Sequence, residues 1–233
     1  MFVATPTHTH HDICYNLLAK RVNVFCEKPL TADPGRSDKL FVLADMSDAY
    51  LFVDWVFLFN DHVKYLKHII DNKKLGNLKS INMNRLNMGP IRHDVNARED
   101  LSSHDISILH YLNGGEMADR AEWINYKRNS HSDTHDSCIG LLWFGNTFVQ
   151  INTSWHYGKK DRECIFEFEH GFVVWDDVKQ TITINGDQVD VKYSSPLQNS
   201  INAFLNKDVP LEEMRNITKK IEWEMRDGHS SFR

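Results

Sequence analysis

The sequence lacks the features that mark several classes of protein. Its four cysteines are scattered among 233 residues without a C-x-x-C pair, which favours reduced thiols in a cytoplasmic protein over disulfide staples. A net charge of −5 without a stripe of lysine and arginine argues against a nucleic-acid partner. The longest apolar run, residues 51–59, contains Asp54 and is too short to span a bilayer. We expect a soluble protein that binds neither nucleic acid nor membrane.

The first third of the chain alternates between strand and helix patterns. Apolar strands are predicted at 2–4, 22–26 and 50–53, with a helix at 12–21 and a second one beginning after Asp33. Strands that alternate with helices predict a parallel sheet. Residues 1–60 are therefore predicted to form βαβ units, and this segment looks like part of a Rossmann-like, dinucleotide-binding domain.

A different pattern, predicted to form a second domain, follows over residues 61–233. It opens with a helix from Asp61, which should end near Gly76 as a C′ residue. Asn185-Gly186 predicts a hairpin turn, and helical periodicity returns from Pro196. The predicted fold is α/β plus α+β, in which the partial parallel sheet is followed by a large, mostly antiparallel sheet with flanking helices. Strand-like runs cover 139–144, 147–155, 164–168, 172–175 and 181–184.

Lys28 lies where the strand 22–26 ends, in the run Glu27-Lys28-Pro29. The carboxyl ends of parallel strands face the ligand crevice, so a cation there can meet a cofactor ribose or a substrate hydroxyl. Pro29 fixes the turn and favours an extended backbone at Lys28. The alternative for this residue type is a solvated lysine after a strand.

Asp100 and His104 form a second candidate pair. On a helix, residues at i and i+4 share one face, so the carboxylate can orient the imidazole. The unperturbed pKa of histidine lies near neutrality, which suits a group that takes a proton from an alcohol. The alternative is an ordinary surface contact between two helical side chains.

Two groups of histidines lack the partners of a metal site. Three histidines crowd residues 8–11, and His131, Asp133 and His135 lie in a polar stretch between predicted strands. Neither group has thiolate ligands or the glutamate of a zincin. We therefore assign no metal site.

Three motifs occur in a fixed order. They are Ala4-Thr5-Pro6-x-His8-x-His10, then Glu27-Lys28-Pro29, then Asp100-x3-His104. In this order and at these separations they resemble the Gfo/Idh/MocA family of NAD(P)-dependent oxidoreductases. Sugar-acting members read much like residues 94–96, 100–101, 104–109, 154–155 and 175–177 of this chain.

The resemblance implies a cofactor site and a catalytic group. Thr5 and Pro6 match the turn that lies along bound NAD or NADP, and His10 matches a frequent family histidine. Glu27 and Lys28 match the motif whose lysine reaches the nicotinamide ribose and the reacting hydroxyl.

Asp100 and His104 match the family's substrate-domain pair, with His104 as the acid/base. Together with Lys28 they are the implied catalytic residues. Hydride would pass between the nicotinamide and a ring carbon of a sugar or sugar nucleotide. The family also implies a homo-oligomer formed through the open face of the second sheet, where Trp143, Phe148 and Trp155 are the expected apolar contributors.

The family's G-x-G-x-x-G turn is missing from this chain. None of the 11 glycines has that spacing, so we expect the turn, and the residue that separates NAD from NADP, to precede Met1. The strand 2–4 would be the fourth in a sheet of order 3-2-1-4-5-6, which leaves one of its edges bare.

Three functions are compatible with these observations. The first is a dehydrogenase of a sugar or sugar nucleotide, whose cofactor binding and activity should be weak in a chain without the glycine turn. The second is a relative that uses NAD transiently while it cleaves a glycoside, without net change in the cofactor. The third is a non-catalytic binding or assembly protein, which would not bind a nicotinamide cofactor.

Overall fold

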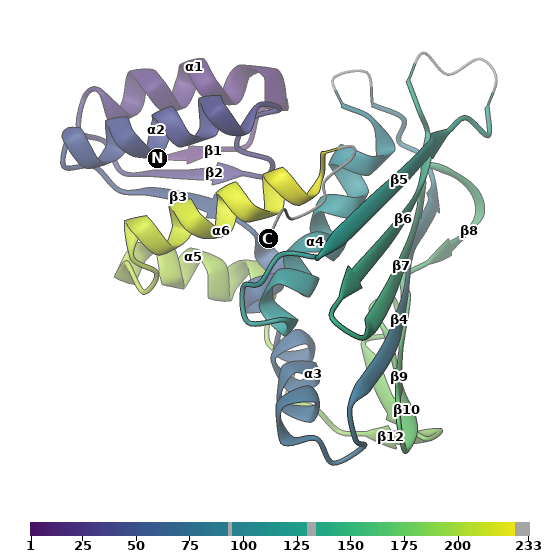
Figure 1. Ribbon diagram of the computed structural model, residues 1–233. Helices are drawn as coiled ribbons and strands as arrows, with labels where there is room; N and C mark the ends of the chain where they lie inside the picture. The colour runs from purple at the N-terminus through teal and green to yellow at the C-terminus, as the bar shows by residue number, and fades with distance from the viewer. Residues whose placement is uncertain (93–94, 130–133, 227–233) are drawn as a thin grey trace.

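The computed structural model describes residues 1–92, 95–129 and 134–226 (Figure 1). Asp94, His131 and Asp133, which entered the sequence analysis, lie outside these ranges. A small parallel sheet and a large, mostly antiparallel sheet organise the described residues. This arrangement confirms the predicted fold class.

The small sheet consists of short apolar strands that run parallel in the order β1, β2, β3. Val24, Cys26 and Phe52 are completely buried, as expected for parallel strands that are covered on both faces. Within the described residues β1 pairs only with β2, so it is an edge strand of this sheet. The strands are β1 (Phe2–Val3), β2 (Val24–Glu27) and β3 (Leu51–Asp54).

Helix α1 (Thr7–Leu18) begins earlier than the sequence pattern predicts. The prediction of 12–21 was wrong because the histidine-rich stretch before Asp12 read as a polar turn. In the structure Pro6 precedes the first turn, and the side chains at spacings of three and four form a buried stripe against the sheet. That stripe consists of Thr7, His10, Cys14 and Leu18.

Helix α2 (Pro34–Met46) begins as predicted, with the Asp33 side chain accepting a hydrogen bond from a backbone N–H of the first turn. Helix α3 (Asp61–Asn72) ends before the predicted stop at Gly76. Lys73 takes the left-handed conformation at its C-terminus, with φ of 52°. Gly76 also has positive φ, and a Cβ there would lie 2.7 Å from Glu169 Cβ, so close packing explains this glycine.

The centre of the large sheet is β4 (Leu78–Met88), which the sequence analysis did not predict as a strand. It runs parallel to β7 (Thr147–Ser154), while the other strand pairs are antiparallel. Ile81 and Met83 are buried on one face of β4, and polar residues occupy the other. The other strands are β5 (Arg120–Tyr126), β6 (Ser137–Phe144), β8 (His156–Asp161), β9 (Glu163–Phe168), β10 (Gly171–Asp176), β11 (Thr181–Ile184) and β12 (Asp187–Val189).

The hairpin prediction at Asn185-Gly186 is confirmed. Both residues have positive φ, of 52° and 92°, as a two-residue turn of this kind requires, and Ile184 faces Asp187 across it.

The prediction that Trp155 contributes to the open apolar face of the second sheet was wrong. It follows β7 and is only 1% exposed, because its indole turns inward to contact the segment around Asp100.

The last two helices return to the small sheet. Helices α5 (Pro196–Asn206) and α6 (Leu211–Glu224) lie on the side of the sheet opposite α1 and α2 (Figure 1). The Trp55 indole N–H donates to Thr218 Oγ1 over 3.1 Å. A continuous apolar core joins both sheets, so a domain boundary at residue 60 stays a prediction.

Among the described residues no helix combines the length and apolar character that a membrane span needs.

Candidate active site

Lys28 lies at the carboxyl end of β2 and reaches across to the second sheet's helices. Its Nζ donates to the backbone carbonyl of Asp100 at 2.5 Å and to the carboxylate Oδ1 of the same residue at 3.3 Å. The side chain is 9% exposed, so the alternative of a solvated lysine was wrong. Burial lowers the pKa of Lys28, while Asp100 and Glu27 oppose that change.

Asp100 is a shared acceptor on the π-helical turn η2 (Arg98–Ser102). Its Oδ1 also accepts from Arg92 at 3.2 Å, and its Oδ2 accepts from the Trp155 indole at 3.0 Å. Three donors from separate segments therefore fix this carboxylate. The contact of Asp100 with Lys28 brings together the two candidates from the sequence, which are Lys28 at the end of β2 and the pair Asp100 and His104.

His104 lies one turn further, on α4 (Ser103–Leu112), but its ring does not meet the Asp100 carboxylate. The described residues contain no hydrogen bond between the two, so the predicted orientation of the imidazole by Asp100 was wrong. The π-helical turn before α4 changes the angular spacing that an uninterrupted α-helix would give. Instead the imidazole packs edge-on against Phe57, with 5.3 Å between ring centroids.

Burial and three nearby cations hold the pKa of His104 well below its usual value. The cations are Lys28, Arg85 and Arg162, in order of decreasing effect. The imidazole is therefore neutral at neutral pH and keeps a lone pair that can accept a proton. This is the state that a general base requires.

A buried ion pair that the sequence analysis missed supports this arrangement. Arg85 of β4 donates to Asp105 Oδ1 through Nε at 2.9 Å and through Nη2 at 2.7 Å. Both residues are buried, and the guanidinium lies 4.8 Å from the centroid of the Phe57 ring. The pair thus packs behind the ring that contacts His104.

Asp54 is a further missed residue, at the carboxyl end of β3 in register with Glu27. Ser200 Oγ donates to its Oδ1 at 2.5 Å. Burial raises the pKa of Asp54 to about 7, with Glu27 adding to the rise and the Ser200 bond opposing it. The strand-end rule that selected Lys28 would also have selected Asp54.

Asp54 should make stability depend on pH. The folded state holds its proton up to a pKa of about 7, whereas an unfolded aspartate loses it near about 3.9. The folded state therefore binds more protons in this interval, and the free energy of unfolding should fall as pH rises through it. Asp54→Asn should flatten that fall in thermal melts at pH 5 and pH 8, and the exposed control Asp45→Asn should not. Parallel pH profiles for Asp54→Asn and the unmodified protein would contradict this assignment.

Among the residues predicted to lie along the cofactor, Thr5 and Pro6 follow β1 and His10 lies in α1. His10 is buried, with Nδ1 3.0 Å from the Pro29 carbonyl and Nε2 2.8 Å from the Thr5 carbonyl. Both ring nitrogens face backbone oxygens, so His10 braces the loops after β1 and β2. Thr5 and Pro6 are exposed, and Thr5 Oγ1 lies 2.7 Å from Thr9 Oγ1.

One cavity of about 460 Å³ collects these groups at the carboxyl edge of the small sheet. It is bounded by the ends of the three parallel strands, by η2 and α4, and by the start of α5. Ligand sites in open parallel sheets lie at this edge. Its lining includes Thr5, Thr7, His10, Glu27, Lys28, Asp54, Arg92, Asp100 and His104.

Two family profiles match the chain. Residues 1–55 match "Oxidoreductase family, NAD-binding Rossmann fold", and residues 63–187 match "GFO/IDH/MocA C-terminal domain". The second match alone covers more than half of the sequence. The chain belongs to the Gfo/Idh/MocA family of oxidoreductases. The predicted resemblance is thus confirmed, and with it the nicotinamide dinucleotide as the cofactor class of the family.

Sequence relatives of this Gfo/Idh/MocA chain include two inositol dehydrogenases. It is 22% identical to myo-inositol 2-dehydrogenase of Thermotoga maritima over 95% of this chain and 69% of that protein. It is 33% identical to inositol 2-dehydrogenase of Mycolicibacterium gilvum over 50% of this chain and 34% of that protein. The chain therefore spans about a third of the second protein's length.

Solved structures with the same fold include a UDP-N-acetylglucosamine 3-dehydrogenase, GnnA, from Acidithiobacillus ferrooxidans. The TM-score is 0.82 at 19% identity, over 96% of this chain and 75% of that one. An inositol dehydrogenase homologue from Azotobacter vinelandii, complexed with NADH and myo-inositol, gives 0.79 at 15% identity, over 97% and 74%. At these identities the likeness establishes the fold.

The described residues fit the nicotinamide-ribose end of such a cofactor. Glu27 and Lys28 both line the cavity, where an ammonium can donate to ribose hydroxyls and a carboxylate can accept from them. His10 is already bonded to the backbone, so we expect it to shape the site without contacting the cofactor.

Proposed function

We propose that the protein is a NAD- or NADP-dependent dehydrogenase that acts on a hydroxyl-bearing ring carbon of a sugar, sugar nucleotide or cyclic polyol. The observation that carries the proposal is the contact of Lys28 with Asp100 beside a neutral His104 in one cavity. The inositol and sugar-nucleotide dehydrogenases named above support the substrate class.

Each catalytic group has a distinct task. The neutral imidazole of His104 accepts the proton of the substrate hydroxyl. The Lys28 ammonium donates a hydrogen bond to the same oxygen and stabilises the negative charge that develops on it. Asp100 holds Lys28 in place through both of its hydrogen bonds. A bound nicotinamide would supply the hydride acceptor for the substrate carbon, so that loss of the hydroxyl proton to His104 and of the hydride leaves a ketone.

The test is oxidation of defined substrates. The protein is incubated with NAD or NADP and with myo-inositol, glucose or UDP-N-acetylglucosamine, and formation of the reduced cofactor is followed by absorbance. We expect reduction with at least one ring substrate. Glycoside cleavage without net reduction would favour the family members that use NAD transiently. Absence of cofactor binding in calorimetry would favour the non-catalytic alternative and overturn the proposal.

The large sheet supports assembly through one margin of its open face. Trp143 and Phe148 are cross-strand partners with ring centroids 5.4 Å apart, and Ile124 on β5 is 52% exposed. The middle of that face is polar, because Asn152 donates to the side chains of Asn82 and Asn84. The predicted broad apolar face is therefore interrupted by a polar middle.

A symmetric dimer formed through this margin should be visible by light scattering at micromolar concentration. Trp143→Asp should shift the mass to that of a monomer, because an ionised side chain would replace an apolar contact. Val42→Asp, at an exposed apolar position on α2, is the matched control and should leave the mass unchanged. A monomer in the unmodified protein would refute the assembly.

A further inference from the structure

Asp54 presents an open oxygen to the active-site cavity. The residue is only 2% exposed and lines that cavity. Ser200 donates to its Oδ1, and no donor among the described residues reaches its Oδ2. Oδ2 keeps accessible surface, unlike the enclosed Oδ2 of Asp105, which also lacks a partner. Because a buried carboxyl oxygen without a donor is costly, one that opens onto a cavity points to a ligand.

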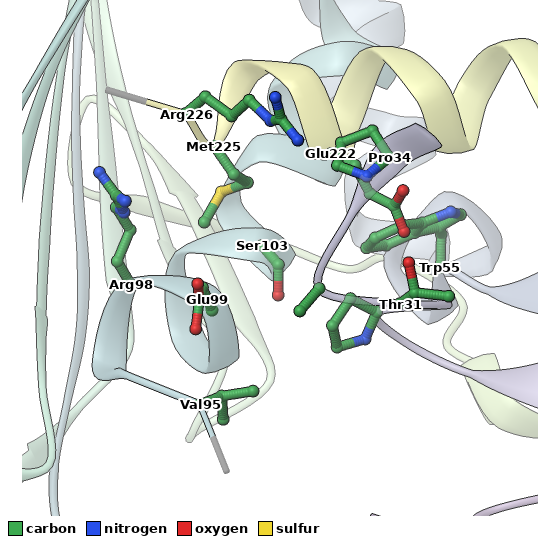
Figure 2. Close-up of a pocket in the computed structure, with 12 residues that line it drawn as sticks. Thr31, Pro34, Trp55, Val95, Arg98, Glu99, Ser103, Glu222, Met225 and Arg226 are labelled. Atoms are coloured by element: carbon green, nitrogen blue, oxygen red, sulfur yellow. The ribbon is translucent and has the colours of Figure 1, made fainter. Parts of the chain in front are cut away.

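The end of β3 that carries Asp54 is fixed by both C-terminal helices. Ser200 on α5 holds Oδ1 at 2.5 Å, and Trp55, the next residue in the chain, donates to Thr218 on α6. The Trp55 side chain lines a separate cavity of about 260 Å³ between the β2–α2 loop, η2 and the end of α6 (Figure 2). The direction of Oδ2 is therefore set before any ligand arrives.

Glu27 is the neighbour of Asp54 in the sheet. The two residues are register partners on adjacent strands, so their side chains point to the same face and their Cα atoms lie about 4.8 Å apart. Glu27 also lines the cavity. In the part of the chain that the structure describes, no three acidic, histidine or cysteine side chains gather as metal ligands would. The open oxygen of Asp54 therefore requires a hydrogen-bond donor on an organic ligand.

Apolar side chains lie next to this oxygen along the chain. Val56 follows Asp54 by two residues, and Leu197 precedes Ser200 by one turn of α5. Both line the cavity, as does Ala4 after β1, and its other lining residues are polar or charged. A flat ring can pack against these apolar groups and present a substituent to Oδ2. The surroundings of Asp54 thus fit an aromatic ring that carries a hydrogen-bond donor.

We propose that Asp54 binds the carboxamide of the nicotinamide ring and is the residue that selects the amide over the corresponding acid. The inference rests on the proposed function, which brings the nicotinamide end of the cofactor into this cavity. Ribose hydroxyls that contact Glu27 and Lys28 place the attached ring near the next strand, where Asp54 lies. The carboxamide N–H supplies the donor that Oδ2 lacks, whereas a carboxylate brings a like charge.

The test compares nicotinamide mononucleotide with nicotinic acid mononucleotide, which differ only in this substituent. Both are titrated calorimetrically into the whole protein at pH 8, where most Asp54 side chains are ionised because their pKa is about 7. We expect the amide to bind at least about tenfold more tightly, since the acid loses one hydrogen bond and meets a like charge.

Three results would overturn the inference: equal affinities, tighter binding of the acid, or no binding of either mononucleotide. Titration with intact NAD or NADP decides the dehydrogenase proposal separately, so the two failures are distinguishable.

Asp54→Asn isolates the contribution of this carboxyl. An asparagine can present either its oxygen or its amide N–H to the cavity, so the variant should bind the two mononucleotides with affinities within about twofold of each other. Comparing both ligands on both proteins cancels the effects of Lys28 and Arg92, which also line the cavity. Asp45→Asn, at an exposed carboxyl on α2, is the matched control and should keep the full preference. An unchanged preference in Asp54→Asn would contradict the role of Asp54.

Discussion

Replacing Lys28 or His104 with alanine is expected to lower turnover about 10²- to 10⁴-fold, the usual cost of losing one group that transfers or stabilises a proton. His104→Ala removes the proton acceptor, and Lys28→Ala removes the donor that faces the developing charge. Steady-state rates with the best ring substrate are the measurement. The exposed histidine of α3 gives the control His68→Ala, which should retain full activity. Near-normal turnover in either alanine variant would remove that residue from the mechanism.

The pH dependence of kcat/KM should reflect the low pKa of His104. A general base works only when deprotonated, and the pKa of His104 is held well below its ordinary value. The acidic limb of kcat/KM should therefore lie well below the ordinary titration range of a histidine. Arg162→Gln removes one of the three cations around His104 and should move that limb to higher pH. An unmoved limb would mean that another group sets it.

Replacing Arg85 with methionine should destabilise the protein by about 3–5 kcal/mol, because Asp105 would be left as an uncompensated buried carboxyl. The double variant Arg85→Met with Asp105→Leu removes both charges and keeps the volume filled, so it should recover most of that loss. Urea denaturation measures both. A double variant as unstable as the single one would show that packing, and not the unpaired charge, causes the loss.

The fold was predictable wherever local signals agreed with long-range packing. The Asn185-Gly186 turn and the Asp33 cap each act over a few residues, so the sequence identifies them directly. Strand β4 was missed because asparagines occupy its outward positions and make the segment read as polar. Its strand character comes from neighbours on both sides, which lie about 70 and 85 residues away along the chain.

The site was predictable in its membership and only partly in its geometry. Lys28 was a candidate from its place at a strand end, the resemblance of Glu27-Lys28-Pro29 to the family motif gave it a role, and its contact with Asp100 agrees with both. The orientation of His104 depends on a π-helical turn, for which the sequence carries no marker. Arg85 could not be found from the sequence, because the residue type of an arginine in a strand does not reveal whether its side chain is buried or exposed.

The return of α5 and α6 to the small sheet constrains how the protein is made. Asp54 meets Ser200 across 146 residues, and Trp55 meets Thr218 across 163. A ribosome adding about 5–20 residues per second needs roughly 8 to 33 s to cover the longer interval. During that time the face of the small sheet that α5 and α6 later cover stays exposed, and so does the carboxyl of Asp54. Strands β1, β2 and β3 are thus synthesised well before the helices that cover them, and a chaperone that holds nascent apolar strands would act here on these strands.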